Sequence, residues 1–258
     1  MRESKGRECA PPAGSKQKLK HCPARRVLYL EPMQIWAGLG NPGPKYTMNR
    51  HNVGFMATDV IANMHGFGPV QKKFSGWVQE GRIGPEKIVL LKPATFMNES
   101  GRSIGEALRF YKLEPDALTV FHDELDIAPY KVKLKQGGGH AGHNGLRSIA
   151  QHVGPDYRRI RLGIGHPGHK DRVAGYVLSD FARAEADALD DMLRGISDGA
   201  PHLVEGDAGR FQNAVALRLN PPRSSTTKPK SDAPKVEKPT EPESDDRSTL
   251  QKLVDRFR

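Results

Sequence analysis

Two periods of apolar residues alternate along the middle of this 258-residue chain. Apolar residues that are continuous or recur at every second position predict strands, and those that recur at every third or fourth position predict helices. The predicted strands occupy residues 33–40, 76–84, 86–93, 116–125, 130–135 and 157–167. The predicted helices occupy residues 52–66, 99–112, 144–153, 183–206 and 210–219. Because the two kinds interleave, we expect an α/β fold: a single globular domain with a central, mixed, twisted β-sheet flanked by helices.

Both ends of the chain lack this patterning. Residues 1–32 are basic and rich in Pro and Ser, which predicts a disordered N-terminal extension, or a segment upstream of a true start at Met33. A targeting segment is an alternative, but the helical pattern is poor. Residues 221–247 are Pro-, Ser- and charge-rich and should be disordered, whereas 248–258 have the spacing of a short helix or a fraying end. The folded domain is therefore expected at 33–220.

The charge of the chain is unevenly distributed. The net charge is +10, and the stretch 131–172 holds nine basic and two acidic residues, whereas 180–207 holds eight acidic and two basic. A single basic zone favours a local site for a polyanion, although solvated faces would give the same counts. No apolar run approaches the ~20 residues of a membrane helix. Both cysteines, Cys9 and Cys22, precede the predicted domain, which is consistent with a reducing cytoplasm.

A glycine-rich turn follows the first predicted strand. The sequence GLGNPG, residues 38–43, has the spacing of a dinucleotide-binding fingerprint. Such a loop needs a helix that begins within the glycines and directs its amides at a pyrophosphate. Pro42 removes one of these amides, Pro44 disfavours a helix at Gly43, and the next helical pattern starts near Asn52. The sequence therefore predicts a tight turn and no dinucleotide cofactor.

Polar side chains gather where the predicted strands end, which is where catalytic groups of α/β sheets collect. Each has a structural alternative as a turn, cap or surface residue. The pair His140 and His143 suggests zinc, but it lies in a glycine loop rather than on a helix, and no cysteine accompanies it, so we expect no metal. The group comprises Asn41, His51, Asn52, Asn98, His122, Asp123, His140, His143 and Asn144.

The glycine loop at 137–139 has basic strands on both sides. Its backbone amides are suited to hold a phosphate. Lys133 and Lys135 lie two residues apart, as do Arg159 and Arg161, so each pair shares one face of its strand. These faces are candidate phosphate contacts.

Six blocks of residues, in order, carry a resemblance to a known family. They are GLGNPG, YTMNRHNVG, KPATFMNESG, HDELD, GGGHAGHNGL and RRIRLGIGHP. Together they resemble the bacterial peptidyl-tRNA hydrolase family over residues 33–220. The resemblance implies that family's α/β fold and its activity, cleavage of the ester between a peptide and the terminal ribose of tRNA. It implies peptidyl-tRNA as the partner, with no cofactor and no metal.

The resemblance also assigns roles to residues. His51 is implied as the general base that activates water, Asp123 as the carboxylate that orients it, and Asn41 as the residue that distinguishes a blocked from a free aminoacyl group. Lys135 and Arg161 match a basic pair that binds the tRNA 5′ phosphate. Further substrate-contact positions are Tyr46, Phe96, Met97, Asn98 and Asn144.

From these features we expect a cytoplasmic, monomeric enzyme that does not bind membranes. Two alternatives of other classes remain at this point. One is an RNA-binding module without catalysis that uses the same basic zone, and the other is a metal-dependent hydrolase. Hydrolysis of an N-blocked aminoacyl-tRNA in the presence of EDTA distinguishes all three.

Overall fold

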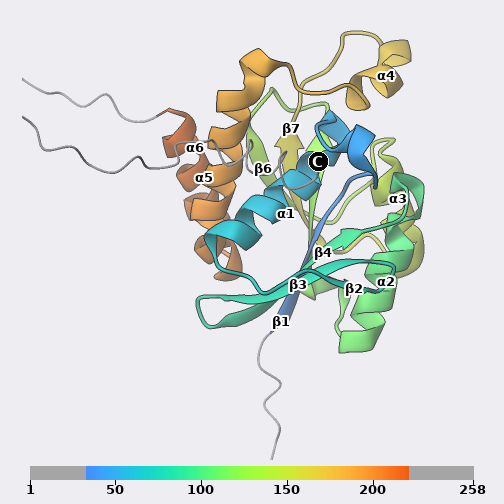
Figure 1. The fold of residues 1–258 in the computed structure, drawn as a ribbon, viewed down its shortest axis with the longest axis vertical. Coiled ribbons are helices and arrows are strands. Elements are labelled where there is room, and N and C mark those ends of the chain that lie inside the picture. Colours follow the sequence, from blue (N-terminus) through green and yellow to red (C-terminus); the bar gives the residue numbers. More distant parts are fainter. Residues whose placement is uncertain (1–32, 221–258) are drawn as a thin grey trace, which may run out of the picture. The chain divides into compact units, whose positions relative to one another are not determined.

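The computed structural model of the chain describes residues 33–220, so the predictions for 1–32, 221–247 and 248–258 lie outside the described residues. Seven strands form one sheet in the order β2-β3-β4-β1-β5-β7-β6 (Figure 1). Strands β4, β1, β5 and β7 run parallel, while β2, β3 and β6 add antiparallel edges. The strands are β1 Met33–Gly38, β2 Gln71–Lys73, β3 Gly76–Ile83, β4 Glu86–Pro93, β5 Leu118–Glu124, β6 Val132–Gln136 and β7 Arg158–Gly163.

Helices cover both faces of this sheet (Figure 1). Helices α1, α5 and α6 pack on one face, and α2 and α3 pack on the other. The α-helices are α1 Val53–Met64, α2 Ser100–Tyr111, α3 Asn144–Val153, α4 Val173–Val177, α5 Ala186–Val204 and α6 Ala208–Leu219. Short 3₁₀ turns are η1 Pro44–Tyr46, η2 Arg50–Asn52, η3 Met97–Glu99, η4 Pro115–Ala117, η5 Lys170–Arg172 and η6 Arg183–Glu185.

The central strand β1 divides the core into two apolar layers. Trp36 is fully buried against the α1 and α5 layer, whereas Ile35 and Ala37 are buried in the layer of α2 and α3. Because both faces of a parallel strand are covered, the buried part of β1, residues 35–38, is a continuous apolar run rather than an alternating one.

The α/β fold expected from the sequence is confirmed, with a mixed sheet between helices. Every predicted strand and helix within 33–220 is present, and β3 and β4 form an antiparallel hairpin. Two elements were not predicted: the edge strand β2, whose sequence QKK is polar and exposed, and the five-residue helix α4. None of the helices in 33–220 has both the length and the hydropathy for crossing a membrane.

Residues 38–43 form a tight turn without a helix, as Pro42 and the following Pro44 predict. A three-residue 3₁₀ turn, η1, follows it, and α1 begins only at Val53. Its glycines instead allow close packing against α1. A Cβ on Gly38 would lie 2.4 Å from the carbonyl oxygen of Gly54, and one on Gly40 would lie 2.7 Å from the ring of Phe55. The first turn of α1 is therefore held against the end of β1.

Candidate active site

Four candidate site residues lie at the carboxyl ends of three parallel strands. Asn41 follows β1, Met97 and Asn98 follow β4, and Asp123 lies at the end of β5. His51, in η2, is brought there because the start of α1 packs on β1: the amide of Phe55 donates to the carbonyl of Leu39 at 3.2 Å. The local fold thus joins segments that are far apart in the sequence.

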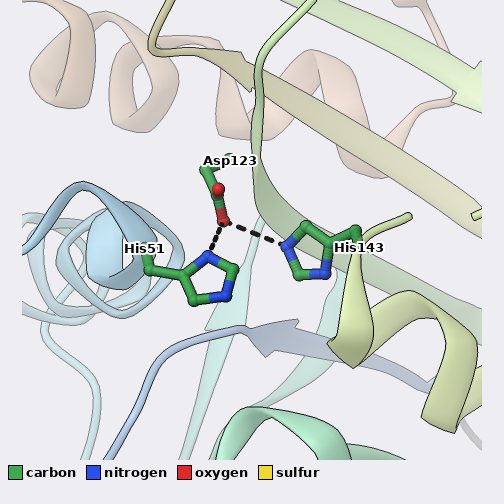
Figure 2. A group of neighbouring side chains, drawn as sticks. All are labelled: His51, Asp123 and His143. Atoms are coloured by element: carbon green, nitrogen blue, oxygen red, sulfur yellow. Dashed lines mark hydrogen bonds and ion pairs between the residues drawn. The ribbon is translucent and has the colours of Figure 1, made fainter. Parts of the chain in front are cut away.

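His51 and Asp123 form a buried hydrogen bond (Figure 2). The Nδ1 of His51 lies 2.8 Å from Oδ1 of Asp123. Since an ionised carboxylate only accepts hydrogen bonds, Nδ1 carries the proton and Nε2 keeps a lone pair. Within the described residues Nε2 makes no hydrogen bond, and it lies on the side of the ring away from the carboxylate (Figure 2). This tautomer is the one that a general base requires.

A second histidine binds the same carboxylate oxygen. Nε2 of His143 lies 3.0 Å from Oδ1 of Asp123 (Figure 2). His143 is also the N-cap of α3, and its Nδ1 accepts from the amides of Gly145 at 3.1 Å and Leu146 at 3.4 Å. Because Nδ1 accepts, the proton of a neutral His143 sits on Nε2 and is donated to Asp123. One oxygen therefore accepts from two imidazoles.

The pKa values of the pair shift in opposite directions. Burial lowers the pKa of His51, but the charge of Asp123 and the hydrogen bond to it outweigh burial, so the pKa is raised above the ordinary value of 6.5. Burial raises the pKa of Asp123, but the nearby His51 and His143 lower it further, and it lies well below its usual range. Asp123 is thus ionised near neutral pH, and it stabilises the imidazolium that forms when His51 accepts a proton.

His122 lies beside this group but remains neutral. Its side chain is buried, and its Nδ1 lies 2.8 Å from the backbone oxygen of Asp123. Burial, together with the nearby His143, lowers the pKa of His122 to about 3. The ring packs edge-on against the ring of His143, with centroids 5.2 Å apart. His122 therefore supports the ring of His143 without adding a positive charge.

Asn41 is fixed on both its backbone and its side chain. The side chain of Asn52 accepts from the Asn41 amide at 2.9 Å and donates to its carbonyl at 3.0 Å. The amide of Met97 donates to Oδ1 of Asn41 at 2.9 Å. Within the described residues no hydrogen bond engages Nδ2 of Asn41. The carboxamide is thus oriented, with its two N–H donors left for a ligand. Asn52 occupies the N-cap position of α1, as its structural alternative predicts, but its side chain makes no cap hydrogen bond and binds Asn41 instead.

The other predicted contact residues lie on the surface around this group. Phe96 is 59% exposed, Asn98 and Asn144 are exposed, and Tyr46 is half-buried in η1. Oδ1 of Asn144 accepts from Arg147 of the same helix, so its amide nitrogen is the end left for a ligand.

Met97 is buried and connects two of these segments. A Cβ on Gly145 would lie 2.6 Å from the sulfur of Met97, so η3 packs directly against the start of α3. This packing brings together the elements that carry Asn98 and Asn144.

The basic residues share one face of the β5-β7-β6 edge, as their spacing predicts. Lys133 pairs with Arg161 across the strands, and Lys135 pairs with Arg159. Lys133 and Lys135 are exposed and make no ion pair within the described residues. Nε of Arg161 donates to Oε2 of Glu124 at 2.8 Å, an ion pair that the sequence did not predict.

Arg159 is not available to a phosphate, contrary to the expectation from its spacing. It is 2% exposed and stacks on the ring of Tyr157, 4.7 Å from its centroid. Its terminal nitrogens donate to the backbone oxygens of Gly138 and Gly139. Equal spacing thus conceals two roles, because β7 begins beside the glycine loop: Arg159 holds that loop from inside, while Arg161 reaches the surface.

His51, Asp123 and His143 also have the composition of a metal site. Their hydrogen bonds argue against it. The ring nitrogens that face the carboxylate are the protonated ones, and the remaining nitrogen of His143 caps α3. A metal would need a lone pair at those facing nitrogens, ~2 Å from the ion. His140 is exposed and is not part of this group of three.

Two residues of the site received no role from the sequence. Asn52 and His143 were among the polar residues at strand ends, but their partners are 11 and 20 residues away, respectively. A histidine directly before a predicted helix, in GHNG, was the available signal for a cap. Its second contact, with Asp123, depends on the pairing of distant strands.

The chain is similar to known proteins over most of its length. The model of the peptidyl-tRNA hydrolase family matches residues 35–224. A peptidyl-tRNA hydrolase of Dinoroseobacter shibae is 64% identical over 235 residues, which cover 88% of this chain and 100% of the relative. One of Novosphingobium aromaticivorans is 70% identical over 186 residues, which cover 72% and 97%.

A solved structure is also similar. The crystal structure of peptidyl-tRNA hydrolase from Acinetobacter baumannii has a TM-score of 0.67 and 39% sequence identity to this chain. The superposition covers 72% of this chain and 95% of the Acinetobacter protein.

Proposed function

The chain belongs to the peptidyl-tRNA hydrolase family, and we propose that it cleaves the ester between peptide and tRNA with His51 as the base that activates water. Its enzymatic activity is peptidyl-tRNA hydrolysis, the activity of relatives that match most of its length. The observation that carries the mechanism is the hydrogen bond of 2.8 Å from His51 to Asp123, which leaves Nε2 free.

The reaction follows from this tautomer. Nε2 of His51 takes a proton from a water molecule while the oxygen of that water attacks the ester carbonyl carbon. Asp123 stabilises the resulting imidazolium. The bond between the acyl carbon and the ribose oxygen then breaks, and the imidazolium returns the proton to the ribose oxygen. The products are a peptide with a free carboxyl group and a tRNA with its hydroxyl restored. Asp123 keeps its negative charge throughout.

Asn41 is suited to test whether the substrate amine is blocked. Its Oδ1 is bound to the Met97 amide, so it presents only N–H donors to a ligand. A peptide carbonyl next to the ester accepts from these donors. A free ammonium group offers only donors and cannot pair with them. On this basis Asn41 favours N-blocked aminoacyl groups, as in peptidyl-tRNA.

The surrounding residues are proposed to bind the rest of the substrate. Phe96 and Tyr46 offer rings for the terminal bases or the peptide, and Asn98 and Asn144 offer amide donors. Lys135 and Arg161 would bind the 5′ phosphate of the tRNA. We also propose that the protein acts as a monomer in the cytoplasm.

The decisive experiment measures release of the acyl group from N-acetylated aminoacyl-tRNA by the full chain in EDTA. The proposal expects turnover in EDTA, much slower turnover of the unblocked aminoacyl-tRNA, and no turnover by His51→Ala despite retained tRNA binding. Binding without release by the wild-type chain would favour an RNA-binding module. Loss of activity in EDTA would favour a metal-dependent hydrolase.

A further inference from the structure

The ion pair between Glu124 and Arg161 places a carboxylate inside the basic zone. Glu124 directly follows Asp123 in β5, and β5 pairs in parallel with β7, so that His122 lies beside Arg161. Side chains two residues apart share a strand face, so Glu124 shares the face of Arg161 and of Lys133 on β6. The carboxylate is mostly buried, since its side chain is only 10% exposed.

The contact uses one particular nitrogen of the guanidinium. Nε of Arg161 donates to Oε2 of Glu124 at 2.8 Å, and within the described residues neither terminal nitrogen makes a hydrogen bond. The side chain is 25% exposed, so its outer end reaches solvent. A guanidinium bound through Nε alone keeps its two terminal nitrogens, the pair that grips a phosphate in bidentate fashion.

We propose that Glu124 is a positioning residue for phosphate binding, which holds Arg161 by Nε so that its terminal nitrogens face the 5′ phosphate of the substrate. This inference rests on the proposed function. The ligand chemistry is a terminal phosphate monoester, which carries up to two negative charges and three acceptor oxygens.

Two opposing effects of Glu124 must be compared. Its negative charge repels a phosphate, but its hydrogen bond immobilises the Arg161 side chain before binding, so less entropy is lost when the phosphate is bound. Repulsion would dominate if the carboxylate occupied the terminal nitrogens, where the phosphate must bind. It occupies Nε instead, and the exposed ammonium groups of Lys133 and Lys135 on the same face offset its charge.

The experiment compares substrates with and without the 5′ phosphate. KM and kcat are measured for N-acetylated aminoacyl-tRNA carrying either a 5′ phosphate or a 5′ hydroxyl. Glu124→Ala should raise KM about three- to tenfold for the phosphorylated substrate alone, with kcat unchanged. Glu124→Gln keeps an oxygen acceptor for Nε and should restore most of the affinity. Asp198→Ala, which removes an α5 carboxylate that pairs with Arg218 of α6, is the matched control and should change neither value.

A binding measurement runs in parallel and needs no turnover. The affinity of the same variants is measured for an uncharged acceptor-stem RNA hairpin with and without its 5′ phosphate, so that a failure of hydrolysis is separated from a failure of phosphate binding. The inference is overturned if Glu124→Ala leaves the affinity for the phosphorylated RNA unchanged, strengthens it, or weakens both RNAs equally. The first result would mean that Glu124 contributes nothing to phosphate binding, and the second that it competes with the phosphate for Arg161. The third would mean a general loss of structure.

Discussion

The side chain of Asn52 binds both backbone groups of Asn41, accepting from its amide at 2.9 Å and donating to its carbonyl at 3.0 Å. Asn52 directly follows His51 in the chain. A single buried amide therefore sets the distance between the turn that carries Asn41 and the 3₁₀ turn that carries the base.

Removing the side-chain amide of Asn52 should loosen both Asn41 and His51. We expect Asn52→Ala to lower kcat/KM for N-acetylated aminoacyl-tRNA about 10- to 100-fold, because small displacements of reacting groups are costly. The preference for the blocked over the unblocked substrate should fall as well. Asn52→Asp keeps the acceptor for the Asn41 amide and should be affected less. An unchanged preference in Asn52→Ala would mean that Asn41 is held without it.

The pH dependence should report the raised pKa of His51. Catalysis needs the unprotonated ring, so kcat/KM should rise with pH and reach half of its maximum above 6.5, the ordinary value. Without the charge of Asp123, burial alone lowers the pKa of His51. In Asp123→Asn the midpoint should therefore move to lower pH while the maximum falls by about two orders of magnitude or more, because the tautomer is no longer fixed. A midpoint that does not move would contradict the role of Asp123.

The two contacts of His143 can be separated by substitution. Asparagine is a good N-cap, but it is too short to reach Asp123. His143→Asn should therefore keep α3 and a Tm near the wild type, while kcat/KM falls about tenfold because Asp123 loses one donor. His143→Ala should lose the cap too, at about 1 kcal/mol of stability. Thermal unfolding and turnover, measured on both variants, separate the cap from the active-site contact.

Arg159 should act on the glycine loop rather than on the phosphate directly. Arg159→Ala removes the donors for Gly138 and Gly139 from a buried position, so we expect a loss of about 2–4 kcal/mol in stability. Amide hydrogen exchange should accelerate across 137–142. Arg210→Ala, an exposed arginine on α6, is the control and should change stability by less than about 0.5 kcal/mol. Unchanged exchange in the loop would show that the glycines hold their own conformation.

Periodicity was sufficient for the sheet and the principal helices because their apolar faces are long. It failed at β2, where three polar residues pair only through their backbone, and at α4, where five residues cannot show a period. The close contact between α1 and the sheet is also informative in retrospect. Gly54 tolerates no side chain there, since a Cβ would lie 2.3 Å from the carbonyl of Phe121.

The contacts of the site also divide into those that the sequence could predict and those that it could not. The contact between His51 and Asp123 agrees with the roles that the resemblance implies for them. The partners of Asn52, His143 and Glu124 depend on which strands are neighbours, and no local pattern contains that information. Arg159 shows the limit most clearly, because its spacing matches that of Arg161 and only the packing of the loop above it distinguishes them.

The strand order has a consequence for synthesis on the ribosome. Strand β1 emerges first, but it lies in the middle of the sheet and gains its neighbours only when β4 and β5 have emerged. His51 is translated more than seventy residues before Asp123, and His143 follows twenty residues later. A nascent chain that ends before Asp123 holds the base, His51, without its carboxylate. We therefore expect the nascent enzyme to be inactive in hydrolysis, and to become active only after α3 has left the exit tunnel.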